Sequence, residues 1–375
     1  MTSVKEILDD MDEKLILLDK VDALRLVSSF FVKEWATTDL SAVHTSKITS
    51  GLINSLQLIW RDNIALTEPA AMLIRHFGRS GEIEEPKSTS TTLSAAQQAI
   101  VYWEMSRRGW GPEIYGFFPG GRLEEYFVGA HTLTAAESTQ PEILRGIARS
   151  YARLHSLELP LRRDSSELIT QELFESVQSK RAEVLRTLQT VDDPFARKYV
   201  AIFEATDWVS EMEWVRKLFK EHNYKITVTH GDTNHLNVLI KNADVKDRVV
   251  LIDYETVSYS YRGFDLGGHF TERMYCYNHP DTQLTGYSVP DKEEQQAFCK
   301  AYLQELQDLG EKRSEHETVP QIMLEATIGR LYHLLFTNMM CMVFDDIEVE
   351  PLFLSGLVHM METYKQLKQE FERDH

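Results

Sequence analysis

The first 130 residues alternate short apolar runs with turn-forming residues, which is the pattern expected of β-strands joined by tight turns. Strands are predicted in "SKITSGLINSLQLIW" (46–60), in "PAAMLIRHFG" (69–78) and on both sides of the Pro-Gly-Gly turn in "GPEIYGFFPGGRLEEYFVG" (111–129). Apolar residues at helical spacing predict helices in most of 1–36 and over 93–109. This part of the chain is therefore expected to be rich in strands.

Beyond residue 130 the apolar residues take the spacing of amphipathic helices. Helices are predicted over 141–159, most of 167–189, 194–221, and in long segments from 291 onward. One segment, 225–255, is instead rich in strand-forming residues.

The contrast between the two parts predicts two domains with a boundary near residue 130. The 375 residues exceed what one simple core needs, and 43% of them are hydrophobic, enough to build two cores. A small β-rich N-terminal lobe (1–130), expected to bind nucleotide, would precede a larger, mostly helical C-terminal lobe (131–375). Protein-kinase-like phosphotransferases have this organisation, so we predict an α+β, two-lobe, protein-kinase-like fold.

The charge balance limits the partners that the protein can have. There are 58 acidic and 40 basic residues, a formal net charge of −18. Binding to nucleic acid or to an anionic membrane requires clustered Lys and Arg, so neither partner is expected. The excess of acidic residues is compatible with a cationic substrate.

Three cysteines without CxxC spacing predict neither a disulfide framework nor a structural zinc site. The N-terminal segment has acidic residues where a signal peptide has basic ones, and its apolar run "LILL" is short. No apolar run approaches the roughly 20 residues of a membrane span. We therefore expect a reducing, cytoplasmic setting without a membrane span.

A polar segment, "VTHGDTNHLNVLI" (228–240), interrupts the strands of 225–255. Asp232 and Asn237 stand in the pattern D-x-x-x-x-N, with His230 two residues ahead. Kinase catalytic loops use this spacing because the Asp accepts or orients the proton of the attacking hydroxyl and the Asn reaches a magnesium ion on the phosphates. We expect His230 to brace the loop by hydrogen bonding and His235 to face solvent.

A second acidic position follows in "VVLIDYE" (249–255), where Asp253 ends an apolar strand. Glu255 is expected to point to the same side of an extended chain. Magnesium that bridges phosphates needs one or two carboxylates and keeps some of its water, so both residues are candidate ligands. The alternative is a hairpin with an ordinary polar turn, in which Asp253 is simply an acid at a strand end.

These two segments together resemble the choline/ethanolamine kinase family. The first matches the family's phosphotransferase loop, and "LIDYETVSYSYRGFDLGGHFTERMYCY" (251–277) matches its motif IDxExxxxNYRGFDxGNHFxE. Further resemblance lies in "SGLINSL", similar to the family's nucleotide loop, in "LIRHFG", similar to its ATP-contacting strand, and in "GPEIYGFFPGGRLEEYF", similar to the segment that runs into its hinge. The resemblance spans roughly residues 45–345.

The resemblance implies ATP and magnesium as cofactors. Asp232 would be the catalytic base that also contacts the substrate hydroxyl, and Asn237 and Asp253 would hold magnesium beside the nucleotide, with Glu255 assisting. The remaining nucleotide contacts fall in the phosphate-covering loop, in the hinge and in the catalytic loop. They are Ser50, Gly51, Leu52, Ile53, Asn54 and Ser55, then Glu125, Tyr126 and Phe127, then Asn234.

Arg75 matches the family's basic strand residue, which neutralises phosphate charge as a lysine does in protein kinases. The alternative is a solvated arginine on an edge strand. Kinase-like folds often pair this residue with a Glu on the following helix. The alignment places Gln98 near that position and Glu104 further along, so the acidic partner stays open.

The expected cation pocket departs from the family pattern. Aromatic faces and a carboxylate hold a quaternary ammonium, and Glu272 and Tyr277 match the family's pocket positions. Phe336 and Met339 stand where choline-using members have two tryptophans, but apolar residues at helical spacing are more often part of the core. The site would then bind choline less tightly, or bind ethanolamine, whose primary ammonium has three N–H donors.

Two hypotheses follow for the function. The first is an ATP- and magnesium-dependent kinase that phosphorylates choline in the first step of phosphatidylcholine synthesis, with ethanolamine as the alternative substrate. The second is a catalytically weak family member that acts as a binding partner, which the intact Asp232, Asn237 and Asp253 argue against. A related aminoglycoside-type or amino-acid-type kinase would lack "YRGFDLGGHF". A homodimer formed through the N-terminal helix is compatible with the pattern.

Overall fold

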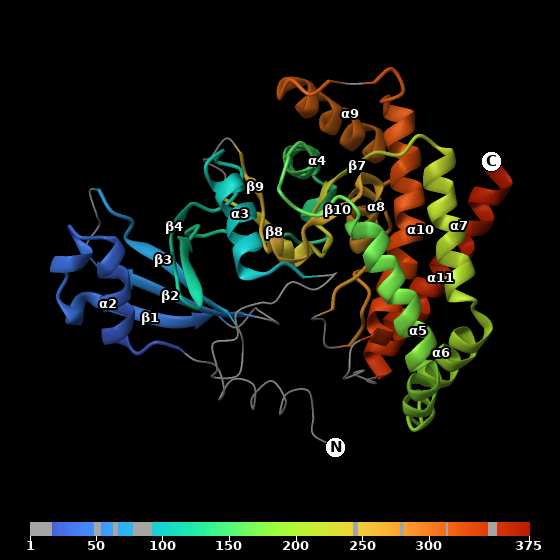
Figure 1. Ribbon diagram of the computed structural model, residues 1–375, viewed down its shortest axis with the longest axis horizontal. Helices are drawn as coiled ribbons and strands as arrows, with labels where there is room; N and C mark the ends of the chain where they lie inside the picture. Colours follow the sequence, from blue (N-terminus) through green and yellow to red (C-terminus); the bar gives the residue numbers. More distant parts are fainter. Residues whose placement is uncertain are drawn as a thin grey trace. The chain divides into compact units, whose positions relative to one another are not determined.

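The computed structural model describes residues 17–48, 54–62, 67–77, 92–242, 247–277, 281–312, 314–343 and 351–375. The chain forms two compact units, Met1–Ala130 and His131–His375, each with its own secondary structure (Figure 1).

The N-terminal unit is built on a five-stranded antiparallel sheet in the order β1-β2-β3-β5-β4. Its strands are β1 (Val43–Ile48), β2 (Asn54–Arg61), β3 (Ala71–Phe77), β4 (Ile114–Phe118) and β5 (Gly121–Glu125). The turn between β4 and β5 contains Gly120 at φ 83°, a left-handed conformation that favours glycine. The strands predicted from the sequence in this unit are confirmed, and β3 lies inside the sheet.

Two helices accompany this sheet, α2 (Lys20–Phe30) and α3 (Ala95–Ser106). Helix α3 begins with a capping box in which Ser94 and Gln97 each bond the other's backbone amide. Ala23 and Val27 of α2 share a buried cluster with Ile59, Ile74 and Leu123 of the sheet. The apolar spacing of both helices is thus explained by burial of one face.

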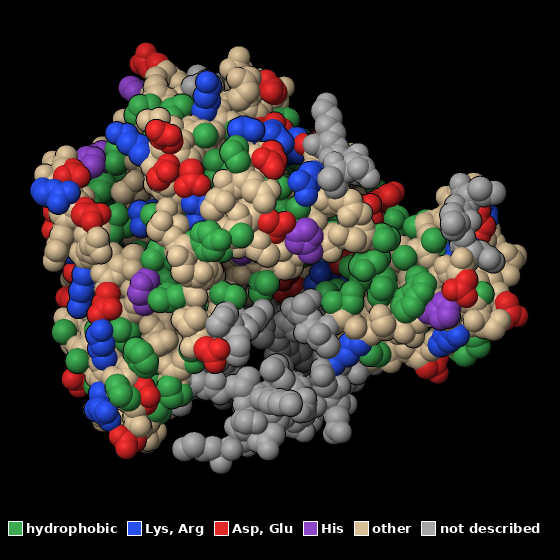
Figure 2. All heavy atoms as spheres, turned by 180° about the vertical axis from the view of Figure 1, so that it is seen from behind, with side chains coloured by type: hydrophobic (Ala, Val, Ile, Leu, Met, Phe, Trp, Pro, Cys, Tyr) green, Lys and Arg blue, Asp and Glu red, His purple; other side chains and the backbone are tan. Residues whose placement is uncertain are grey.

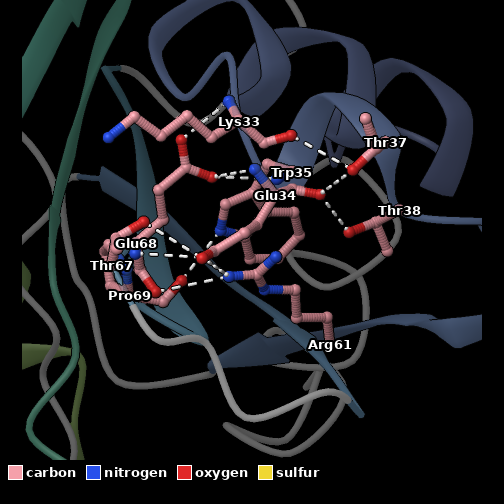
Figure 3. A network of polar contacts seen from close by, with 9 residues as sticks. All are labelled: Lys33, Glu34, Trp35, Thr37, Thr38, Arg61, Thr67, Glu68 and Pro69. Carbon is pink, nitrogen blue, oxygen red and sulfur yellow. Dashed lines mark hydrogen bonds and ion pairs between the residues drawn. The ribbon is translucent and has the colours of Figure 1, made fainter.

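Two carboxylates connect the segment after α2 to the β2–β3 hairpin (Figure 3). Glu68 accepts hydrogen bonds from the backbone amides of Lys33, Glu34 and Trp35, at 2.7–2.9 Å, and so satisfies the free donors at the start of the 3₁₀ helix η1 (Trp35–Thr37). In return, the Glu34 carboxylate accepts from the Glu68 amide at 3.0 Å and from Arg61 at 2.8 Å. These bonds fix the leading segment to the sheet.

The C-terminal unit is mostly helical. Its helices are α4 (Pro141–His155), α5 (Ser165–Gln189), α6 (Pro194–Ala205), α7 (Trp208–Glu221), α8 (Arg262–Glu272), α9 (Lys292–Asp308), α10 (Val319–Val343) and α11 (Pro351–Asp374). Helix α10 packs against α5, α7, α8 and α11, and Figure 1 shows these long helices side by side. Their facing side chains form one large apolar core.

Most of 194–221 is helical, as predicted, and the structure divides it into two helices, since α6 ends at Ala205 and α7 begins at Trp208. Asp207 caps α7 by accepting a hydrogen bond from the Ser210 amide at 3.1 Å.

The segment 225–255, predicted to be strand-rich, contributes three strands to two small antiparallel sheets, which also include β6 (His131–Thr132) and β10 (Ser258–Tyr261) from outside it. One sheet joins β7 (Ile226–Thr229) to β10, and the other has the order β6-β8-β9, with β8 (Val238–Ile240) and β9 (Val249–Leu251). The remaining 3₁₀ helices are η2 (Leu40–Ala42), η3 (Glu137–Thr139), η4 (His235–Asn237) and η5 (Tyr254–Thr256).

Glycines allow α8 and α10 to approach each other closely. A Cβ atom on Gly267 would lie 2.2 Å from the carbonyl oxygen of Ala326, and one on Gly329 would lie 1.6 Å from that of Gly263. Real side chains cannot occupy such positions, so the backbones of the two helices are in direct contact. Two of these glycines belong to "RGFDLGGHF", which explains part of that motif by packing.

None of the helices in the described ranges is long and apolar enough to cross a membrane. On the face drawn in Figure 2, acidic side chains are interspersed with Lys and Arg rather than gathered in one area.

Candidate functional site

The polar segment predicted to be catalytic forms a loop between β7 and β8 of the C-terminal unit. Its side chains hold its own backbone: the Asp232 carboxylate accepts from the Asn234 amide at 3.2 Å, and the Asn237 side-chain amide donates to the Asp232 carbonyl at 3.4 Å. Asn234 accepts from the Leu236 amide at 2.9 Å. The loop therefore brings Asp232, Asn234 and Asn237 together.

His230 braces this loop, as its position predicts. Its Nε2 lies 2.8 Å from the carbonyl oxygen of Ile252, to which it donates, and its own carbonyl accepts from the Thr256 hydroxyl at 2.8 Å. The Ile252 amide also donates to the Asn237 carbonyl at 2.9 Å. These bonds place the residues after β9 directly beside the loop between β7 and β8.

Asp253 stands next to these contacts in a strained conformation. Its φ of 66° is left-handed, which is uncommon for a residue with a side chain and is frequent at functional sites. Its Oδ1 is buried and finds no hydrogen-bond partner among the residues that the structure describes. A buried carboxylate oxygen without a donor is costly unless a cation binds it, so Asp253 fits a metal-ligand role.

The expectation of an extended chain through Glu255 is wrong. The left-handed turn at Asp253 leads into the 3₁₀ helix η5, and Glu255 lies within that helix, 4% exposed. Residues two apart point to the same side only in an extended chain. That rule therefore does not apply to Asp253 and Glu255.

Negative charge accumulates around Asp232. Burial raises the pKa of Asp232, His230 opposes the rise, and the carboxylates of Glu272 and Asp253 add to it. In the described residues, no group of three or more His, Cys, Asp or Glu side chains is arranged to hold a metal ion. Magnesium bound by Asn237 and Asp253 would take its other ligands from phosphates and water, which is its usual mode beside nucleotides.

Glu272, the expected partner of a cationic substrate, lies at the end of α8 and is 4% exposed. Its Oε1 accepts hydrogen bonds from the Tyr277 hydroxyl and from His333 Nε2, each at 3.0 Å. The structure thus places Tyr277 beside Glu272. It adds His333, which sequence reasoning missed although a lone histidine in the apolar stretch of α10 was a signal.

The positions that replace the family's tryptophans belong mainly to the helical core. Met339 is fully buried in this core, and the ring of Phe336 packs against Phe264 at 5.2 Å and Tyr332 at 5.8 Å. Met339 is therefore part of the helical core, which is the alternative that its helical spacing favoured.

His235 does not face solvent, so that expectation is wrong. It is 7% exposed, and burial lowers its pKa to about 4 despite the nearby charge of Glu272. Its ring lies 5.2 Å from that of His269 on α8. His235 is therefore a neutral, packed residue within the loop between β7 and β8.

In the N-terminal unit, Arg75 is 6% exposed on the inner strand β3 and is not a solvated edge residue. Its guanidinium pairs with Glu124 of β5, at 3.1 Å, and Glu124 also accepts from Arg122 at 2.6 Å. Burial opposes ionisation of Glu124, but the two arginines outweigh it and lower its pKa to about 2.

Gln98 and Glu104, the two positions on α3 where a partner for Arg75 was sought, bond to other groups. Gln98 donates to the Leu93 carbonyl at 3.0 Å, and Glu104 pairs with Arg107 and Arg108.

The other expected nucleotide residues are placed in part. Asn54 begins β2, Ser55 is buried beside it, and Glu125 ends β5 with Tyr126 and Phe127 directly after it. The Glu125 amide donates to the Glu113 carbonyl at 2.8 Å. This backbone N–H is therefore already used in a hydrogen bond within the protein. Ser50, Gly51, Leu52 and Ile53 lie outside the described residues.

Comparison with known proteins agrees with this architecture. The structure of choline kinase from Cryptosporidium parvum has a TM-score of 0.66 at 17% identity and covers 99% of this chain and 97% of that chain. That of an ethanolamine kinase from Plasmodium vivax has a TM-score of 0.58 at 18% identity, covering 86% of this chain and 82% of that one. The fold is that of the protein-kinase-like phosphotransferases, as predicted.

Sequence comparison defines the family. A model of the family "Choline/ethanolamine kinase" matches residues 45–348. The choline/ethanolamine kinases of rat and human are each 30% identical to this chain over 258 and 256 residues, which is 68% and 67% of this chain. These alignments cover 60% and 59% of the two relatives. The chain belongs to the choline/ethanolamine kinase family, as its motifs indicate.

Proposed function

We propose that this protein transfers the γ-phosphoryl group of ATP to the hydroxyl of an amino alcohol, with choline as the first candidate and phosphocholine as the product. The observation that carries the proposal is the convergence of Asp232, Asn237 and Asp253 at one loop and one strand end. Family membership supports it, because the rat and human relatives are choline/ethanolamine kinases.

The residues take the following roles in this proposal. Asp232 accepts or orients the hydroxyl proton, and its raised pKa makes it a better base than an exposed aspartate. Asn237 and Asp253 hold magnesium, with Glu255 as an additional candidate, and the bound ion neutralises charge on the phosphates. Arg75, fixed by Glu124, neutralises phosphate charge as well.

The ammonium end of the substrate would lie at Glu272. Two donors, from Tyr277 and His333, share Oε1 and orient the carboxylate. The second oxygen then remains for the cation. The charge of Glu272 in a buried setting attracts either a quaternary or a primary ammonium.

Ethanolamine is the second candidate substrate. Met339 lies in the core and the ring of Phe336 packs against another ring, so the pocket has fewer aromatic faces for a quaternary ammonium. With fewer aromatic faces, oxygen acceptors would contribute more of the binding, and they favour an ammonium that carries N–H groups. A relative from Arabidopsis thaliana, a probable ethanolamine kinase, is 26% identical over 272 residues. A cytoplasmic setting and a homodimer through the N-terminal helix complete the proposal, and the sequence is compatible with both.

The test is steady-state phosphoryl transfer from ATP with magnesium, using ethanolamine, its N-methyl and N,N-dimethyl derivatives, and choline. If kcat/KM rises along this series, the pocket recognises a quaternary ammonium. If it falls, the substrate is a primary amine. No turnover with any of the four would contradict the proposal and favour a binding role.

A further inference from the structure

The motif "YRGFDLGGHF" contains Asp265, which has no part in the proposed chemistry yet is completely buried on α8. Its carboxylate accepts hydrogen bonds from the backbone amides of His230 at 2.6 Å and Gly231 at 3.1 Å, one on each oxygen. These two residues directly precede Asp232. Asp265 therefore fixes the peptide groups that lead into the proposed catalytic base.

Asp265 is itself held by a residue from another helix. Nε2 of His155, at the end of α4, lies 3.0 Å from Asp265 Oδ2, and both side chains are fully buried. Since a carboxylate only accepts, Nε2 carries the proton. The other ring nitrogen, Nδ1, is then an acceptor, and it lies 2.9 Å from the hydroxyl of Tyr302 on α9.

The direction of these bonds is fixed at both ends. Burial lowers the pKa of His155 despite the nearby Asp265, so the ring is neutral. Burial also raises the pKa of Tyr302, whose hydroxyl interacts with the Arg262 guanidinium. Because Nε2 of the neutral ring donates to Asp265, Nδ1 can only accept, so the Tyr302 hydrogen points to His155.

Arg262 is anchored in turn by Glu325 of α10, at 2.7 Å, and by Glu317. Asp265 bonds to His155 and His155 to Tyr302, while Arg262, the first residue of RGFD, contributes its charge near the Tyr302 hydroxyl. All four side chains are buried, where such bonds are strengthened and a missing partner is costly.

We infer that His155 and Tyr302 are positioning residues for phosphoryl transfer: they orient Asp265, and Asp265 sets the backbone of the loop that carries Asp232. Gly231 supports the same geometry, since its φ of 83° and its contact with the carbonyl of Thr256 leave no room for a side chain. The inference rests on the proposed role of Asp232 for its effect on turnover, whereas its effect on the loop amides does not depend on any activity.

The test uses three variants of this hydrogen-bonded set. Tyr302→Phe removes one hydroxyl at constant shape, His155→Leu removes both ring nitrogens, and His155→Gln retains an N–H donor. Leu154→Val, a fully buried neighbour on α4 outside the set, controls for loss of core packing. The readouts are kcat, both KM values, melting temperature and hydrogen exchange of the His230 and Gly231 amides.

We expect His155→Leu to lower kcat about 10- to 100-fold and Tyr302→Phe to lower it about threefold to tenfold, with both KM values changed less than about threefold. Exchange of the two amides should accelerate by about tenfold or more in His155→Leu, and His155→Gln should recover part of both effects.

The inference is overturned if Tyr302→Phe leaves kcat and amide exchange unchanged. It is also overturned if Leu154→Val, at an equal loss of melting temperature, lowers kcat as much. If His155→Leu does not fold, Tyr302→Phe decides. Faster exchange in a protein that phosphorylates none of the amino alcohols would support the loop geometry and count against the proposed function alone.

Discussion

Arg75 and Glu124 form a buried ion pair between neighbouring strands, with Nη2 and Nε of the arginine at 3.1 and 3.2 Å from one carboxylate oxygen. The other oxygen accepts from Arg122. Because the acid lies on β5, the sheet itself orients Arg75, whereas protein kinases take the corresponding acid from a helix. The position of α3 is therefore not needed for this pair.

Replacing Glu124 tests this arrangement. Glu124→Gln leaves two buried arginines without their shared carboxylate, which should destabilise the fold by about 3–5 kcal/mol and lower kcat/KM for ATP at least about tenfold. Unfolding in urea and ATP kinetics measure the two effects. Glu104→Gln, on α3, should leave the free energy of unfolding nearly unchanged. It should also change kcat/KM for ATP by no more than about twofold. A larger loss in Glu104→Gln than in Glu124→Gln would show that the helix supplies the acid.

The Glu34–Arg61 pair predicts how the stability of the N-terminal unit responds to acid. The hydrogen bond from Arg61 lowers the pKa of Glu34 to about 2, below its ordinary value of 4.5. The group therefore stabilises the fold above about pH 4.5, and this contribution is lost as the pH falls toward 2. Glu34→Gln should lower the melting temperature at pH 7 and weaken its decrease between pH 5 and 3.

Glu183→Gln, which replaces an exposed carboxylate on α5, is the control variant for Glu34→Gln. Equal pH profiles for wild type and Glu34→Gln would contradict the assignment.

Most helices and strands could be predicted from the sequence, because each buries one face and its apolar residues repeat with the matching period. The helical content of 194–221 could be predicted, but the apolar spacing did not locate the break between α6 and α7. The signal was local: Asp207 stands three residues before Ser210 and four before Glu211, a capping pattern.

The candidate site could be predicted where short motifs contain it, as for Asp232 and Asn237 in one segment and Asp253 in the next. It could not be predicted where the partner is distant in sequence. Glu124 lies 49 residues from Arg75, and His333 lies 61 residues from Glu272. Such pairs depend on strand order and helix packing. His235 was misassigned because α8 covers a polar loop that, considered alone, indicates exposure.

The burial of His235 predicts its titration. With a pKa of about 4, its ring should stay neutral throughout the range in which an exposed histidine gains a proton. In NMR spectra its ring signals should be constant from pH 8 to about 5 and change only near pH 4. Since the folded pKa is below the ordinary value of 6.5, His235 lowers stability progressively as the pH falls below that value. A midpoint near 6.5 would contradict the buried position.

Asp253 should control the affinity for magnesium. Asp253→Asn removes a charged ligand and should raise the magnesium concentration for half-maximal activity at least about tenfold, because a hard cation depends strongly on carboxylate oxygen. Asp247→Asn, at a half-exposed acid in the same unit that pairs with Arg153, is the matched control and should leave this concentration unchanged. Equal magnesium dependence in both variants would exclude Asp253 as a ligand.

The most direct test of the central claim is the comparison of wild type with Asp232→Asn in phosphoryl transfer from ATP to the better of choline and ethanolamine. Phosphorus NMR would follow the product, and calorimetry would measure ATP binding. We predict that wild type forms the phosphorylated amino alcohol and that Asp232→Asn lowers kcat by about 10²–10⁴-fold, while the Kd for ATP changes less than about threefold. Near-normal kcat in Asp232→Asn would show that Asp232 is not the catalytic base.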